Sequence, residues 1–193
     1  MKQLTTREKI QYAVLELMET KDLSKIHVKE VTDKLNISRQ AFYLHYDSVY
    51  AVVQEIQDTF LRQLHDGFMR YSTIQLDDRY FYEPNPAIIE SAALFRQNSE
   101  LYNRLSGENG TPMFQYHLRK YVRQYIVDRA MKEGYIHVPD AICPIVSDYI
   151  ANGYASILES LLRKPLDISD ADLATMIYRL LFAPFRLKKD ADK

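Results

Sequence analysis

The sequence predicts an all-α protein of about nine helices. Apolar residues recur at intervals of three and four along most of the chain, which is the period of an amphipathic helix. Helix-capping residues precede several of these segments and are followed by Pro or by an acidic residue three positions on. No segment alternates convincingly between apolar and polar residues, and the 193 residues include only 5 glycines.

The first three helices are short and close together. Thr5 and Glu8 form a capping box before the apolar face of a first helix, made by Ile10, Ala13, Val14, Leu17 and Met18. A second helix repeats this spacing with Val28, Val31 and Leu35. Asn36 follows, and Asn tolerates the left-handed backbone that a sharp turn needs. Ser38 can then cap a third helix, which has to end before the next capping pair at Asp47-Ser48.

Longer helices are expected in the rest of the chain. Apolar spacing predicts a helix over residues 48–71, and Asn85-Pro86 marks the start of the next one. Further helices are expected over residues 99–105, 112–133, 139–164 and from 169 to about 187. We therefore predict a domain over residues 1–47 and a second over 48–193, connected by the helix 48–71.

Composition excludes several classes of protein. Lys and Arg number 25 against 26 Asp and Glu, so the chain is not grossly basic. A single cysteine excludes an internal disulfide and any cysteine-based zinc cluster. Neither a glycine-rich nucleotide loop nor a G-x-S-x-G context is present, so we expect no enzyme, no catalytic residue, no cofactor and no metal site. No apolar run reaches the ~18 residues of a membrane span, and the first residues lack a signal-peptide core. A cytoplasmic protein with no membrane partner is the expectation.

Residues 28–46 have the spacing of a helix-turn-helix. Its core positions are filled by Val28, Val31, Leu35, Ile37 and Phe42. Residues 24–46 contain four basic and two acidic side chains, although the whole chain has a net charge of −1. The outward face of the second helix presents Ser38, Arg39, Gln40 and Tyr43, with Leu44 beside them. Arg can pair with guanine and Gln with adenine in the major groove of DNA.

These positions define a candidate DNA-binding surface. Backbone phosphates are expected near Ser38, the helix N-terminus and the basic residues before the motif. The predicted DNA-binding residues are Lys25, His27, Val28, Lys29, Ser38, Arg39, Gln40, Ala41, Tyr43 and His45. The alternative is a structural helical hairpin without DNA contact, in which Tyr43 and His45 are core or edge aromatics.

The segment 26–48 resembles the DNA-binding signature of the tetracycline-repressor (TetR) family. Its most recognisable part is the cluster Phe42-Tyr43-x-His45-Tyr46 followed by Asp-Ser. The resemblance implies a three-helix DNA-binding domain, a connecting fourth helix, and a helical C-terminal domain for ligand binding and dimerisation. Asn36 and Gln40 stand where the family commonly has Gly. Val49 stands where it often has a phosphate-contacting Lys, so one phosphate contact is expected to be lost.

Aromatic residues concentrate in the middle of the chain, where residues 60–125 hold 12 of the 23 Tyr and Phe residues. One interpretation is a pocket for a flat or cationic organic molecule, and the alternative is ordinary core filling. The candidate pocket residues are Phe60, Leu64, Phe68, Tyr71, Phe95, Tyr102, Phe114, Tyr116 and Tyr121.

The last two predicted helices carry long apolar stripes, more than a monomer of this size usually exposes. They predict a homodimer through a four-helix bundle, and Gly153 would allow two helices to approach closely. The candidate dimer face comprises Tyr149, Ile150, Gly153, Ile157, Leu161, Leu173, Met176, Ile177 and Leu180.

Together these features predict a dimeric transcriptional regulator, with a repressor favoured. It would bind a palindromic double-stranded DNA operator and respond to a small-molecule effector. One alternative is a protein-interaction co-regulator on the same fold, with a weakened helix-turn-helix. Another is a carrier of an aromatic ligand, for which the sequence gives no positive sign.

Overall fold

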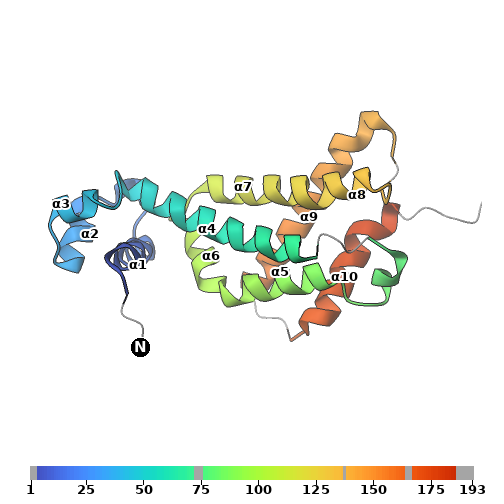
Figure 1. The fold of residues 1–193 in the computed structure, drawn as a ribbon, viewed down its shortest axis with the longest axis horizontal. Coiled ribbons are helices and arrows are strands. Elements are labelled where there is room, and N and C mark those ends of the chain that lie inside the picture. Colours follow the sequence, from blue (N-terminus) through green and yellow to red (C-terminus); the bar gives the residue numbers. More distant parts are fainter. Residues whose placement is uncertain (1–3, 72–75, 137, 164–166, 186–193) are drawn as a thin grey trace, which may run out of the picture. The chain divides into compact units, whose positions relative to one another are not determined.

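The computed structural model describes residues 4–71, 76–136, 138–163 and 167–185, without the side chains of residues 126 and 161–163 (Figure 1). In order, the helices are α1 (Thr6–Met18), α2 (Val28–Leu35), α3 (Arg39–Tyr43), α4 (Val49–Arg70), α5 (Pro86–Gln97), α6 (Ser99–Ser106), α7 (Pro112–Val122), α8 (Asp128–Lys132), α9 (Cys143–Arg163) and α10 (Asp170–Phe182). A π-helical turn, η3 (Arg123–Val127), joins α7 to α8 without a break. These four ranges therefore hold nine continuous helices and no strand, which confirms the all-α class.

The predicted capping residues begin several of these helices. Thr5 accepts from Glu8 N at 3.2 Å, and the Glu8 carboxylate accepts from Thr5 N at 2.7 Å. Asn85 Oδ1 accepts from two backbone N–H groups at the start of α5, and Pro86 occupies the first helical position. Ser169 caps α10 in the same manner. Short-range side-chain chemistry thus sets where these helices begin.

The later elements differ from the predicted ranges in detail. The helix expected from residue 139 starts at Cys143, after a 3-10 turn η4 (Asp140–Ile142). Pro144 then lies in the first helical turn, where its missing N–H costs no helical hydrogen bond. The stretch before α5 contains a 3-10 turn, η2 (Asp78–Phe81), which buries two aromatic rings. The last helix ends at Phe182, and residues 186 and 187 lie outside the described ranges.

Contacts within the chain divide it into two compact units. The first unit comprises residues 1–62 and 99–115, and the second comprises residues 63–98 and 116–193. The predicted domains 1–47 and 48–193 divide the chain differently and stay a prediction about function. The difference arises because α6 packs on α1, so that residues distant in sequence join the N-terminal helices.

The core of the first unit has two parts. Around α1, α2 and α3 the buried side chains include Ile10, Val14, Val31 and Phe42, all 0% exposed. Farther along the chain, three aromatic rings from α4, α6 and α7 pack together, with centroid separations of 5.5–6.4 Å. They are Phe60, Tyr102 and Phe114, each at most 2% exposed.

The core of the second unit forms where α5, α9 and α10 pack on one another. Tyr178 of α10 lies at its centre, with ring centroids at 5.2 Å from Phe81 and 4.9 Å from Phe182. α9 and α10 approach closely at Gly153, where an added Cβ would lie 3.1 Å from Leu181 Cδ2. This glycine therefore serves a close helix contact inside the chain.

Within the described ranges, none of the helices combines the length and the apolar character required to cross a membrane. Within the same ranges, no three His, Cys, Asp or Glu side chains gather where they could hold a metal ion.

Candidate nucleic-acid interface and apolar cavity

The turn between α2 and α3 is built as its sequence predicts. Asn36 ends α2 in the left-handed conformation, with φ 52° and ψ 47°. Ile37 N then donates to Thr32 O at 3.0 Å, which closes the turn. Ser38 Oγ accepts from Ala41 N at 3.0 Å and caps α3. These bonds fix the angle at which α3 leaves α2.

α3 has one buried side and one exposed side. Phe42 is 0% exposed, and its ring lies 6.2 Å from the ring of Tyr46. The exposed side carries Ser38, Arg39, Gln40 and Tyr43, followed by Leu44, which is 78% exposed. The anchored Phe42 thus holds a short row of polar and aromatic side chains toward solvent.

The remaining predicted DNA-binding residues lie in the same compact unit. Lys25, His27 and Lys29 are exposed at the start of α2, whereas Val28, Ala41 and His45 are half-buried. The structure therefore brings all ten residues into one unit, and seven of them are exposed. Their contact with DNA stays a prediction.

A polar network ties α1 to α4 next to this surface. Arg7 donates to both oxygens of Glu55, at 2.7–3.1 Å, and Gln11 Nε2 donates to Glu55 Oε2 at 3.1 Å. The Tyr46 hydroxyl also donates to Glu55. The pKa of Glu55 is held below its usual value, chiefly by Arg7, and burial raises the pKa of Tyr46 to about 12. The network fixes the chain directly after α3.

The first turn of α4 has no cation at the position where the family often has a phosphate-contacting Lys. Val49, which stands where the family often has Lys, is only 4% exposed and belongs to the core. Its neighbour Tyr50 is 57% exposed. Sequence reasoning missed Tyr50. The buried Val49, Val52 and Val53 define the inner face of α4, and Tyr50 lies off that face, so helical period places it toward solvent.

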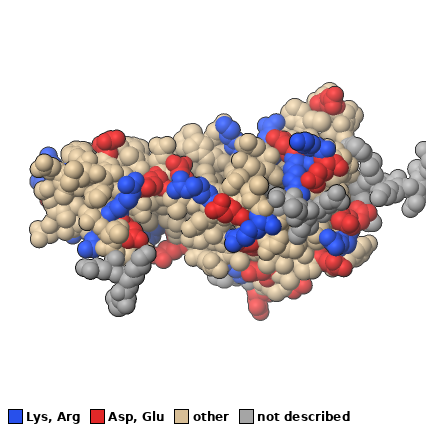
Figure 2. All heavy atoms as spheres, in the orientation of Figure 1, with Lys and Arg blue, Asp and Glu red and all other residues tan. Residues whose placement is uncertain are grey.

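Figure 2 shows the charged residues on one face of the molecule. On the face shown in Figure 2, basic and acidic side chains are interspersed and do not gather into an area of one sign. Several cations are already paired, among them Lys21 with Glu30 and Lys34 with Glu16. The charge on this face therefore does not indicate where DNA would bind.

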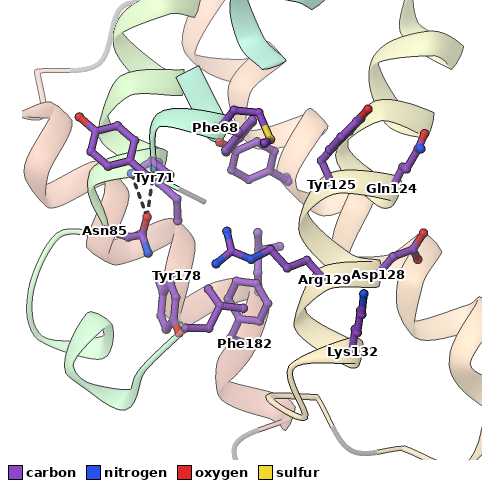
Figure 3. Close-up of a pocket in the computed structure, with 16 residues that line it drawn as sticks. Phe68, Tyr71, Asn85, Gln124, Tyr125, Asp128, Arg129, Lys132, Tyr178 and Phe182 are labelled. Carbon is purple, nitrogen blue, oxygen red and sulfur yellow. Dashed lines mark hydrogen bonds between the residues drawn. The ribbon is translucent and has the colours of Figure 1, made fainter. Parts of the chain in front are cut away.

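The second unit contains a cavity of about 350 Å³ (Figure 3). Its wall is mainly apolar and aromatic, with polar groups at one side. The lining residues are Phe68, Met69, Tyr71, Leu76, Asn85, Ala87, Ile88, Gln124, Tyr125, Asp128, Arg129, Lys132, Tyr154, Tyr178, Leu181 and Phe182.

Two of the nine candidate pocket residues, Phe68 and Tyr71, line this cavity. Tyr121 is half-buried, with its ring centroid 6.2 Å from that of Phe68, and Tyr116 is 55% exposed. The other five are core residues that are at most 2% exposed, namely Phe60, Leu64, Phe95, Tyr102 and Phe114. Eight of the sixteen lining residues come from α5, α8 and α10, and α8 and α10 lie beyond the stretch in which aromatic residues concentrate.

Two tyrosines of the cavity wall have hydroxyl partners. Tyr154 shares a hydrogen bond with Ser91, and the Tyr178 hydroxyl donates to the Asp77 carbonyl at 3.1 Å. Burial raises the pKa of both phenols, so both stay neutral at physiological pH.

Part of the candidate dimer face is already buried within the single chain. Ile150, Leu173 and Ile177 are 0% exposed and pack in the core of the second unit. Tyr149 and Leu180 are each 52% exposed, whereas Gly153, Ile157 and Met176 are half-buried. The side chain of Leu161 lies outside the described residues.

Comparison with known proteins gives matches of three kinds. A TetR-type family model described as "Transcriptional regulator C-terminal region" matches residues 82–183, more than half of the chain. An uncharacterized HTH-type transcriptional regulator of Bacillus subtilis (strain 168), YxbF, is 24% identical over 74 residues. Those residues are 36% of this chain and 20% of that protein, so the match spans about a fifth of its length.

Solved structures share the fold over nearly the whole chain. A TetR transcriptional regulator from Streptococcus agalactiae 2603V is 21% identical, with a TM-score of 0.68 over 92% of this chain and 93% of that one. The dihydroxyacetone kinase operon activator DhaS is 17% identical, with a TM-score of 0.56 over 95% and 97% of the two chains. Regulators of this family bind DNA and are not enzymes. From the matched C-terminal region and the shared fold, this chain belongs to the TetR family of transcriptional regulators.

Proposed function

We propose that this regulator is a ligand-responsive repressor that binds a palindromic operator as a homodimer. The observation that carries the proposal is the exposed row on α3, anchored from behind by the buried Phe42. Arg39 and Gln40 are the base-reading side chains, because their planar groups can bond bidentately to guanine and adenine. Lys25, His27 and Lys29 supply phosphate contacts that position α3 on the duplex.

A second copy of the chain is needed to read a palindrome. Two recognition helices must reach half-sites about one helical turn apart. Tyr149 and Leu180, with Ile145 at 68% exposure, are apolar side chains that α9 and α10 leave in solvent. Burial of these side chains against the same side chains of a second copy supports an isologous dimer.

Ligand response requires a physical link between the cavity and the recognition helix. α4 supplies such a link, because its residues 49–62 belong to the first unit and residues 63–70 to the second. Phe68 and Met69, near its C-terminal end, line the cavity. A ligand that favours one orientation of α4 changes the spacing of the two recognition helices, and ligand and DNA then weaken each other's binding reciprocally.

One observation favours the alternative of a protein-interaction co-regulator. Three large side chains near the recognition surface are more than half exposed, namely Tyr43, Leu44 and Tyr50. Such apolar exposure also suits a protein partner. DNA affinity decides between the two roles.

The test begins with selection of duplexes from a random pool by the purified full-length protein. Fluorescence anisotropy at two salt concentrations then compares a selected duplex with a scrambled one. The proposal predicts preference for a palindrome, two subunits per site and a steep loss of affinity with salt. Unselective weak binding at both salt concentrations would favour the co-regulator.

The sign of regulation needs its own measurement. A reporter gene placed behind the selected operator is expected to be expressed less when the protein is present. Higher expression in its presence would identify an activator instead, and would leave the DNA-binding part of the proposal intact.

A further inference from the structure

Most of the wall of the cavity in the second unit is apolar. Phe68 and Phe182 belong to this wall, and the two wall tyrosines Tyr154 and Tyr178 use their hydroxyls in hydrogen bonds within the protein. A ligand inside therefore meets rings and aliphatic groups over most of its surface. At about 350 Å³ the space suits a small organic molecule.

The charged side chains of the lining do not favour a charged ligand. They are Asp128, Arg129 and Lys132. Arg129 already pairs with Glu133 at 2.6 Å, whereas Asp128 and Lys132, which have opposite charges, are exposed to solvent. A charged ligand group would thus lose its hydration in the cavity without gaining a dedicated counter-charge, so the cavity suits an uncharged ligand.

One polar side chain of the lining, that of Asn85, is buried and only partly used. Asn85 is 5% exposed, and its Oδ1 accepts from Ala87 N at 3.0 Å and from Ile88 N at 3.3 Å as the cap of α5. Because both backbone donors need the oxygen, they fix the orientation of the amide and place Nδ2 on its other side. Figure 3 shows the two bonds as dashed lines, with the Asn85 nitrogen turned away from them toward Tyr178.

The Asn85 amide nitrogen keeps its capacity to donate hydrogen bonds. Among the residues that the structure describes, none accepts a hydrogen bond from this nitrogen. An amide NH₂ group has two donor hydrogens, and a buried donor without an acceptor destabilises a protein. An acceptor that a ligand brings into the cavity therefore gains a hydrogen bond from a group that the fold has already oriented.

We propose that the cavity binds an uncharged, mainly apolar molecule whose carbonyl-type oxygen accepts a hydrogen bond from Asn85 Nδ2. The inference rests on the proposed ligand response and names the chemical class of the effector. It sets aside the cationic ligand that the aromatic residues also allowed. The cap of α5 thereby has a second role, because it holds the donor in one orientation before the ligand arrives and so reduces the entropy lost on binding.

Four probes with the same phenylethyl body and different end groups test the inference. They are the ketone benzylacetone, its hydrocarbon isostere isopentylbenzene, the carboxylate hydrocinnamate and the ammonium phenylpropylamine. Binding of each to the full-length protein is measured by equilibrium dialysis near neutral pH, without DNA. The ketone is expected to bind about tenfold or more tightly than the carboxylate and the ammonium, because both charged groups lose more hydration than the cavity replaces.

Variants of Asn85 assign the affinity for the ketone to the amide donor. Asn85→Asp has the same shape and keeps the capping oxygen, but it has no amide hydrogens. It should lower the affinity for the ketone relative to the hydrocarbon by about tenfold, because the carbonyl then faces another acceptor. Asn85→Ser keeps an uncharged capping oxygen and should lower the same ratio, and it keeps the test available where Asn85→Asp fails to fold. Asn103→Asp makes the same change at an exposed position of α6 in the first unit, so this matched control should leave the ratio unchanged.

Equal or tighter binding of the carboxylate or the ammonium would overturn the inference, and so would absence of binding by the ketone. A ratio of ketone to hydrocarbon affinity that stays unchanged in both Asn85 variants would also overturn it. Because no DNA is present, these outcomes are separate from failure of the proposed DNA-binding function, which the anisotropy measurement detects.

Discussion

The recognition surface and the cavity are built in opposite ways. The recognition surface comes from about twenty contiguous residues between Lys25 and His45, and most of its side chains face solvent. The cavity draws on α4, α5, α8, α9 and α10, segments that are far apart in the sequence. Five of its sixteen lining residues, among them Tyr154 and Tyr178, are also core residues.

Because of this difference, substitutions on the recognition surface change binding without changing stability, whereas substitutions in the cavity change both. An exposed side chain such as Arg39 contributes little to folding, so its removal acts on DNA affinity alone. A cavity residue such as Tyr178, which is 0% exposed, also packs against its neighbours. Substitution there changes ligand binding and stability together. Four predictions follow this contrast, beginning with the largest effect.

Phe60→Ala is expected to destabilise the protein by about 3–5 kcal/mol, because it leaves a hole between Tyr102 and Phe114. Phe68→Ala should cost less, since Phe68 is half-buried and already borders a cavity. Urea unfolding of both variants measures the difference. An equal loss in the two would show that the cavity wall is as tightly packed as the core.

Arg39→Ala is expected to weaken binding to a selected operator by about 1–3 kcal/mol, because a bidentate base contact is lost. Its unfolding midpoint should match that of the unmodified protein. Arg62→Ala is the control: Arg62 is an exposed arginine of α4 that donates to Thr59 at 2.8 Å. Undiminished operator affinity in Arg39→Ala would refute the placement of the recognition helix.

Asn36→Ala is expected to destabilise the protein by about 1–2 kcal/mol, because a Cβ-bearing residue without a polar side chain is disfavoured in the left-handed region. Asn36→Gly, which removes the conformational penalty, should change stability much less. Thermal unfolding compares the two. A large loss in the glycine variant would indicate that the Asn36 side chain itself holds the turn.

Glu55→Gln is expected to cost about 1 kcal/mol at neutral pH, because it weakens the network with Arg7, Gln11 and Tyr46. The Glu55 pKa is lowered in the folded protein, so its contribution is fully present above the ordinary value of about 4.5. It disappears as the pH falls through the lowered pKa. Unfolding at a series of pH values should therefore show the two proteins converging in acid.

Sequence reasoning succeeds where the determining signals are local. Asn36 and Ser38 specify a turn and a cap within a few residues, and the structure has both. The buried Phe42 and exposed Arg39 follow from helical period alone. Fold class and helix count are predictable for the same reason.

Sequence reasoning fails where a site is formed by residues that are far apart in the chain. The aromatic concentration indicated a pocket, but helical period could not separate the lining Phe68 from the core residues Phe60 and Phe114. Arg129 and Lys132 gave no signal, because a charged residue on a helix usually lies on a solvated face. The π-helical turn that precedes them likewise has no short-range marker in the sequence.

The aromatic cluster of Phe60, Tyr102 and Phe114 has a practical consequence for dissecting the protein. A fragment cut after Arg62 would leave Phe60 without either ring partner and α1 without α6. Such a fragment would be prone to aggregate, so loss of its DNA binding would say nothing about the recognition helix. A minimal DNA-binding module would instead need residues 99–115 grafted back through a designed linker, because the chain returns there to complete its N-terminal core.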